Sequence, residues 1–126
     1  MMSELIMEGV CYRYPGTKKE ILTGVDAVFR PGTVTTIMGR SGAGKSTLVR
    51  CINMLDQPTS GKIFVDGEEI TAKGCDVARI RRKMGMVFQH FNLFPHKTVL
   101  ENMIYAPMTV KKESRDVAVA RAKQLL

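Results

Sequence analysis

The stretch Gly39–Thr47 reads GRSGAGKST, and its residue types and spacing suit the binding of phosphate. Its glycines, Lys45 and Ser46 match the pattern G-x-x-x-x-G-K-[ST] of a P-loop. Glycines let backbone N–H groups turn toward phosphate oxygens without a Cβ clash, and the following helix adds the positive end of its dipole. The lysine ammonium reaches the terminal phosphates and the serine hydroxyl ligates Mg²⁺. The loop is therefore predicted to hold a nucleoside triphosphate with Mg²⁺.

The segments on either side of this loop are those that must position it. Residues 33–38 (TVTTIM) are uncharged and largely β-branched, which predicts a strand buried on both faces. The following KSTLVRCINML predicts an amphipathic helix, with Leu48, Cys51, Ile52 and Leu55 on its inward face. A strand before the loop and a helix after it favour a P-loop over a chance glycine-rich turn.

Further strands are predicted from apolar runs and turn residues. They lie at residues 5–15, at 26–29 after the Ile21-Leu22 pair, and at 84–88 (MGMVF). The stretch KIFVDGEEI predicts a hairpin with Asp66-Gly67 as its two-residue turn.

Three more helices are predicted. One covers residues 76–83, and a second begins after Thr98 as N-cap, with Glu101 completing a capping box. The third covers ESRDVAVARAKQLL, with Val117, Ala120 and Leu125 expected to face inward.

Composition sets limits on the class of protein. The 126 residues, 44% of them hydrophobic, suffice for one small domain with its own core. No apolar run reaches the roughly 18 residues of a membrane span, and the N-terminus does not resemble a secretory signal, so a cytoplasmic location is expected.

The cysteines, histidines and charged residues do not indicate a metal site or a nucleic-acid partner. The three cysteines form no C-x-x-C pair, so neither a disulfide framework nor a zinc site is expected, and His90 and His96 are assigned structural roles. The net charge of +7 comes from scattered lysines and arginines without interleaved aromatics, which argues against a nucleic-acid partner.

The sequence resembles the ATP-binding subunits of ABC transporters, and more closely those that power bacterial uptake of polar amino acids. The resemblance covers residues 1–126 and is carried by VFRPGTVTTIMGRSGAGKSTLVRCINMLDQPTSGKIFVDGEEI and by RRKMGMVFQHFNLFPHKTVLENMIYAP. It implies an α/β fold: a P-loop NTPase core with an N-terminal antiparallel β-subdomain. Residues 1–89 would form these parts, and residues 90–126 would begin a helical subdomain.

The same resemblance implies roles for individual residues. Tyr14 would stack on the adenine ring of ATP, the alternative being a half-buried strand tyrosine. Gln89 would contact Mg²⁺ or the attacking water, and would act with Lys45 in catalysis and with Ser46 in metal binding. The phosphates would be wrapped by Gly39, Arg40, Ser41, Gly42, Ala43, Gly44, Lys45, Ser46 and Thr47.

Partners are implied in the same way. Residues 89–105 would face transmembrane permease subunits, with a second ATP-binding subunit completing a dimer and a substrate-binding protein acting indirectly. The chain would then lie on the inner face of the cell membrane, as a peripheral cytoplasmic subunit. The apolar Phe91, Leu93 and Phe94 suit either a docking surface or closure of the local core.

Hydrolysis in this family requires further motifs that the 126 residues do not contain: the LSGGQ-type signature, an Asp-Glu pair after an apolar strand, and a later histidine. The chain is therefore expected to be truncated before the signature and the Asp-Glu strand. This leaves an importer ATPase subunit and a truncated, non-hydrolysing nucleotide-binding fragment as hypotheses. A P-loop kinase for a small molecule is a third, which FNLFPH and the hairpin disfavour.

Overall fold

The structure of the protein, a computed structural model, describes residues 4–126. The chain forms two compact units, of which the first ends at Gly85 and the second runs from Met86 to Leu126. Each unit is described by itself.

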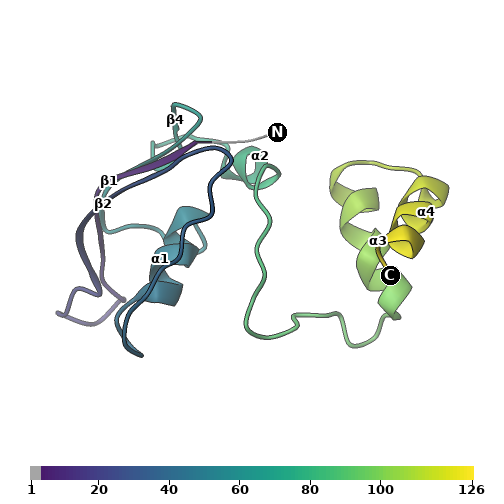
Figure 1. Cartoon of the computed structure of the whole chain (residues 1–126), viewed down its shortest axis with the longest axis horizontal. Coiled ribbons are helices and arrows are strands. Elements are labelled where there is room, and N and C mark those ends of the chain that lie inside the picture. Colours follow the sequence, from purple (N-terminus) through teal and green to yellow (C-terminus); the bar gives the residue numbers. More distant parts are fainter. Residues whose placement is uncertain (1–3) are drawn as a thin grey trace. The chain divides into compact units, whose positions relative to one another are not determined.

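A four-stranded antiparallel sheet forms the main layer of the first unit (Figure 1). The sheet order is β2-β1-β3-β4, so β1 and β3 are its inner strands. The strands are β1 (Leu5–Tyr12), β2 (Leu22–Phe29), β3 (Ser60–Val65) and β4 (Glu68–Glu69).

The predicted strands at residues 5–15 and 26–29 are confirmed, with shifted ends. β1 stops at Tyr12, and β2 begins earlier than expected because Leu22 pairs with Tyr12. The backbone N–H of Ile21 donates to the Tyr12 carbonyl at 2.8 Å, which extends the ladder toward the start of β2.

The predicted hairpin is also confirmed. Val65 pairs with Glu68, which leaves Asp66 and Gly67 as the two-residue turn with φ values of 51° and 80°. Positive φ at both central positions is what a type I′ hairpin turn requires, and the Asp-Gly pair accommodates it.

Two glycines meet at an irregularity in the pairing of β1 with β3. The β1–β3 register shifts between Glu8 and Cys11, and Gly61 of β3 faces the backbone of Gly9 at this irregularity. A Cβ atom on Gly61 would lie 2.4 Å from the Gly9 carbonyl oxygen, and Gly61 has a φ of +88°. Only glycine satisfies both conditions, so Gly61 permits this strand pairing.

One hydrophobic core joins the sheet to two helices, α1 (Lys45–Ile52) and α2 (Val77–Arg81). Cys51 of α1 and Ile80 of α2 are buried there with Met7, Val10, Tyr12, Leu22, Ile63, Val65 and Ile70. Burial raises the pKa of the Cys51 thiol to about 11, so this cysteine is a neutral core residue.

The second unit contains two helices that run in roughly opposite directions, α3 (Val99–Val110) and α4 (Arg115–Leu125). They pack around a small core of Ile104, Ala118 and Ala122. The predicted capping box is confirmed, since Thr98 accepts from the Glu101 N–H at 3.2 Å and its own N–H donates to the Glu101 carboxylate at 2.7 Å. None of the described helices is long and apolar enough to cross a bilayer.

The strand predicted at residues 33–38 is wrong. The segment has no regular secondary structure, and the side chains of Val34 and Met38 are 98% and 86% exposed. A strand exists only where its N–H and C=O groups pair with a neighbour, and no described residues form a ladder with this segment.

The strand predicted at residues 84–88 is wrong for the same reason. These residues join no sheet of the described chain, and Val87 is 99% exposed. Apolar composition, which is also β-branched in residues 33–38, favoured strand in both segments, but no residues of the described chain pair with either one.

The inward face predicted for α1 is confirmed for Leu48, Cys51 and Ile52, which lie in or against the core. Leu55 was placed wrongly, since α1 ends at Ile52 and Leu55 is about half exposed.

In α4 the residues Val117, Ala120 and Leu125 are exposed, while Ala118 and Ala122 are buried. Ala118 and Ala122 lie four residues apart and form the face that packs with Ile104 of α3, so the buried face is turned away from the predicted one.

We predict that Gly61→Ala destabilises the chain much more than Gly67→Ala. Both glycines have positive φ, and alanine there costs about 1–2 kcal/mol. Only Gly61 also meets another backbone, which adds about 1–3 kcal/mol of overpacking or more. Urea unfolding of both variants measures the difference, and equal midpoints would show that the close approach to Gly9 is not tight.

We predict that acid loosens the start of α3. Hydrogen bonds with Thr98 lower the pKa of Glu101, so its stabilising contribution is present above the unfolded-state pKa and is lost as pH falls through the folded-state value. Carbon chemical shifts of the first turn of α3, followed by NMR from neutral pH downward, should move toward coil values. Glu101→Gln should abolish this pH dependence, and a transition that persists in this variant would assign it to another group.

Candidate functional site

The phosphate-binding loop is closed by its own lysine. The Lys45 ammonium donates to the carbonyl oxygens of Gly39 and Arg40, at 2.7 and 2.8 Å, and the Ala43 N–H donates to the Arg40 carbonyl at 3.1 Å. An ammonium has three N–H donors, so two hold the loop and one is left for an anion. The charge of Lys45 is thereby fixed across the mouth of the loop.

The loop turns into α1 at Gly44. This residue is the N-cap of α1 with a φ of 100°, and a Cβ atom on it would lie 2.9 Å from a methyl carbon of Ile21. In the described chain no side chain caps α1, and its first turn holds no acidic residue. The first N–H groups of α1 and its positive dipole end therefore remain for an anionic ligand.

Tyr14 is anchored to α1 by its hydroxyl group. The hydroxyl lies 2.9 Å from Thr47 Oγ1 and accepts from Arg50 Nη2, also at 2.9 Å. Its ring packs edge-on against Tyr12, with ring centroids 5.0 Å apart. The tyrosine is half-buried and held in one orientation. Partial burial leaves part of the ring accessible, so it is compatible with a ligand stacked on the ring.

The loop, α1 and Tyr14 enclose an open pocket of about 500 Å³. The pocket combines an aromatic ring, loop backbone, three serine or threonine hydroxyls and two cationic side chains. It is lined by Tyr14, Ile21, Ser41, Gly42, Gly44, Lys45, Ser46, Thr47 and Arg50. An aromatic platform near a phosphate-sized cradle suits a ligand with a flat base and a phosphate chain.

Most of the sequence-predicted site residues meet at this pocket. Gly39 and Arg40 reach it through their bonds to Lys45, whereas Ala43 is exposed and does not line it. Gln89 lies in the second unit, where it is exposed.

Sequence reasoning missed Ile21 and Arg50 among the lining residues. Arg50 follows Thr47 by three positions, which places both side chains on one face of a helix. That spacing is the signal that could have identified Arg50.

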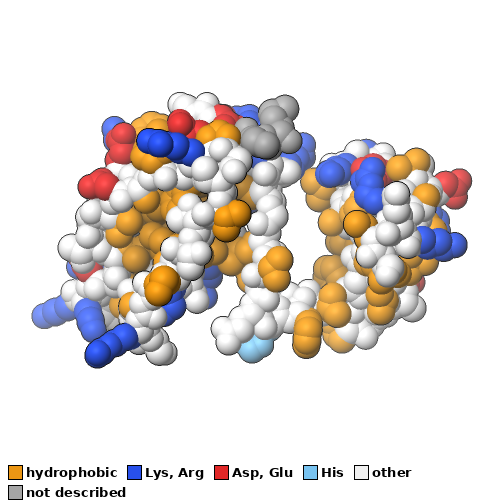
Figure 2. Space-filling view, viewed as in Figure 1, with side chains coloured by type: hydrophobic (Ala, Val, Ile, Leu, Met, Phe, Trp, Pro, Cys, Tyr) orange, Lys and Arg blue, Asp and Glu red, His pale blue; other side chains and the backbone are white. Residues whose placement is uncertain are grey.

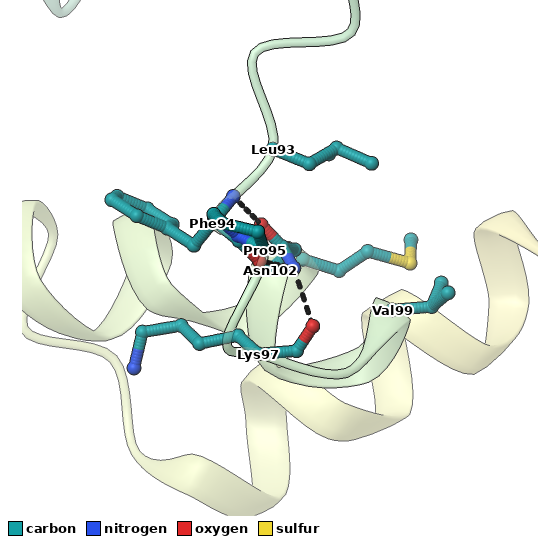
Figure 3. A pocket seen from close by; sticks show the side chains of 7 residues that line it. Leu93, Phe94, Pro95, Lys97, Val99 and Asn102 are labelled. Atoms are coloured by element: carbon teal, nitrogen blue, oxygen red, sulfur yellow. Dashed lines mark hydrogen bonds between the residues drawn. The ribbon is translucent and has the colours of Figure 1, made fainter.

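A second, apolar pocket of about 370 Å³ lies in the second unit (Figure 3). It is lined by Leu93, Phe94, Pro95, Lys97, Val99, Asn102 and Met103. Figure 3 shows the side chains of Leu93 and Val99 extending to one side of the turn and the Phe94 ring to the other.

Three apolar residues in and just before this pocket lie outside the described core of the second unit. Phe91, Leu93 and Phe94 are 92%, 61% and 43% exposed. Phe94 is partly covered by Tyr105, with ring centroids 5.1 Å apart. Hydrophobic side chains therefore reach the surface here, as they do over several parts of the molecule (Figure 2).

Asn102 holds the turn that carries this apolar surface. Its side-chain oxygen accepts from the Phe94 N–H at 2.8 Å, and its two amide N–H groups are shared among the carbonyls of Phe94, Lys97 and Thr98. One side chain thus ties α3 to the whole turn, which gives the apolar surface a fixed shape.

Most of the chain matches a known protein family. The family described as ABC transporter matches residues 22–126. This chain belongs to the ABC transporter family. Solved structures agree, since a dimeric MJ0796, "a Bacterial ABC Transporter Cassette", superposes with a TM-score of 0.84 at 33% identity, over 95% of this chain and 54% of that one. The α/β P-loop fold with an antiparallel β-subdomain is thereby confirmed.

Individual relatives of this ABC transporter-family chain are subunits for amino-acid transport. The arginine transport ATP-binding protein ArtM of Bacillus subtilis (strain 168) is 48% identical over 86% of this chain and 45% of its own length. The L-cystine transport system ATP-binding protein TcyN of Escherichia coli (strain K12) is 43% identical over 99% of this chain and 52% of its own. The chain spans about half the length of the curated relatives it matches.

We predict that Asn102→Ala releases the turn. Removing four side-chain hydrogen bonds, each worth about 1 kcal/mol, should lower hydrogen-exchange protection of the Phe94 amide by about tenfold or more. Asn102→Asp keeps the acceptor for the Phe94 N–H but loses the donors, so it should preserve more of that protection. Unchanged exchange in Asn102→Ala would show that the turn is held by other contacts.

Proposed function

We propose that this chain is the nucleotide-binding part of the ATP-binding subunit of an ABC importer for polar amino acids. It binds ATP through the loop from Gly39 to Thr47, with the adenine ring on Tyr14. In the whole subunit, ATP binding and hydrolysis drive transport.

The convergence of Tyr14 with the loop at one pocket is the observation that carries this proposal. Lys45 supplies a fixed cation there, and α1 supplies N–H groups at its first turn. These groups suit the phosphates, while the tyrosine ring offers a face on which a base stacks. The names of ArtM and TcyN, both ATP-binding proteins of transport systems, support the same assignment.

The donor set also fits Mg²⁺ bound together with the phosphates. Ser46 is exposed and lines the pocket, and Mg²⁺ usually takes one or two protein oxygens beside substrate phosphates and water. Ser46 would hold the ion, and Gln89 is proposed as a further ligand on the resemblance to the family alone. When bound, the ion would neutralise part of the negative charge of the phosphates.

Binding without turnover is the activity expected of these 126 residues. The nearest apolar run followed by an acid is Ile63–Asp66, but Asp66 lies in the β3–β4 turn. There it accepts from the Glu4 N–H at 2.9 Å and pairs with Lys83 at 3.7 Å, so its contacts are structural. The non-hydrolysing alternative therefore describes this stretch of chain, and hydrolysis belongs to the whole subunit.

The second unit supplies the proposed contact with transmembrane permease subunits, through residues 89–105. The exposed apolar side chains around the 370 Å³ pocket, held in shape by Asn102, suit a protein partner. A second ATP-binding subunit would complete a dimer, as MJ0796 is dimeric, and a substrate-binding protein would act indirectly. These partners would place the chain on the inner face of the cell membrane.

We predict that Lys45→Ala weakens MgATP binding to the chain by about 10–100-fold, the value of a charge-assisted hydrogen bond to phosphate. Isothermal titration calorimetry of the 126-residue chain measures the change. Lys62→Ala removes another lysine, exposed on β3 and outside the pocket, and should leave the affinity unchanged. An equal effect of both variants would mean that ATP responds to net charge and not to this site.

A further inference from the structure

We infer that Arg50, held by Asp56, is a positioning residue that fixes the Tyr14 ring as a platform for the nucleotide base. The inference rests on the proposed function, since it concerns how the same pocket recognises its ligand. It assigns roles to two residues that lie outside the phosphate-binding motif.

Arg50 is itself held from two directions. Its Nε donates to Asp56 Oδ2 at 2.9 Å, while its backbone carbonyl accepts from the Asp56 N–H at 3.2 Å. The carboxylate therefore cannot move away from α1 without breaking the turn that follows the helix. Because the guanidinium is planar and rigid, fixing Nε also fixes the direction of Nη2.

That second nitrogen points at Tyr14. Arg50 Nη2 donates to the Tyr14 hydroxyl at 2.9 Å, so the tyrosine accepts there and its own proton is left for Thr47 Oγ1, 2.9 Å away. Thr47 is only 5% exposed, which keeps water from competing for this bond. The phenol ring is thus pinned at its outer end by two partners on α1.

The opposite constraint on Tyr14 comes from β1. Its ring meets Tyr12 edge-on at an interplanar angle of 87°, so one side of the ring is set by the sheet and the hydroxyl is set by α1. A ring held in this way loses little freedom when a base stacks on it, and such preorganisation improves affinity. Phosphate groups bind at the loop and do not draw on this restraint.

Two ligands therefore separate the role of Arg50 from that of the loop. We would measure binding of MgATP and of magnesium tripolyphosphate, which has the phosphate chain but no base, to the full chain by calorimetry. Arg50→Ala should weaken ATP about tenfold, within the contribution of stacking one base, and should weaken tripolyphosphate clearly less, by no more than the loss of one charge from the pocket wall.

Three further variants make the test specific. Tyr14→Phe keeps the ring and the Arg50–Asp56 pair but removes the hydroxyl, so it should reproduce the selective loss even if Arg50→Ala fails to fold. Arg50→Lys, which reaches only one partner at a time, should recover part of the ATP affinity. Arg79→Ala removes an arginine that pairs with Glu68 on the same unit, and should change neither ligand.

The outcomes differ for each possibility. Equal weakening of ATP and tripolyphosphate in both Arg50→Ala and Tyr14→Phe would overturn the inference, because these residues would then support the loop as a whole. Unchanged ATP affinity in both variants would overturn it as well. Failure of the unaltered chain to bind either ligand would refute the proposed function, and the role of Arg50 with it.

Discussion

The pairing of β1 on both of its edges is the constraint on which the first unit depends. β2 and β3 lie on either side of it, and the last rungs place Leu22 opposite Tyr12 and Ser60 opposite Cys11. With this register, the residues that follow β1 and precede β2 lie against α1. They form part of the pocket, in which Tyr14 makes one wall and Ile21 contacts Gly44. The end of the phosphate-binding loop therefore packs against the start of β2, about twenty residues earlier in the sequence.

Features with a local physical cause could be predicted from the sequence. The Asp66-Gly67 turn follows from the positive φ that both residues tolerate, and the Thr98 capping box follows from two reciprocal hydrogen bonds within one helical turn. The P-loop pattern likewise specifies its own backbone. Each signal is contained in a few neighbouring residues, so it holds whatever the rest of the chain does.

The strands predicted at residues 33–38 and 84–88 failed because a strand is not a local structure. Their composition favours extended backbone, but an extended segment gains little until its N–H and C=O groups meet a neighbouring strand. Nothing in the six letters TVTTIM says which segment would supply that ladder. The same limit explains the wrong face on α4, where packing against α3 decided which residues are buried.

The role of Arg50 in the pocket could not be predicted from the sequence for a related reason. Its partner Tyr14 lies 36 positions away, and the link exists only because the sheet brings the two together. α1 carries the phosphate end of the pocket and also the arginine that anchors Tyr14 at the aromatic end. Lys45 and Thr47 stand in its first turn and Arg50 lies one turn later, so the helix geometry sets the spacing between the phosphate cradle and the aromatic platform. A shift of α1 would displace the phosphate-binding loop and both partners of the Tyr14 hydroxyl together.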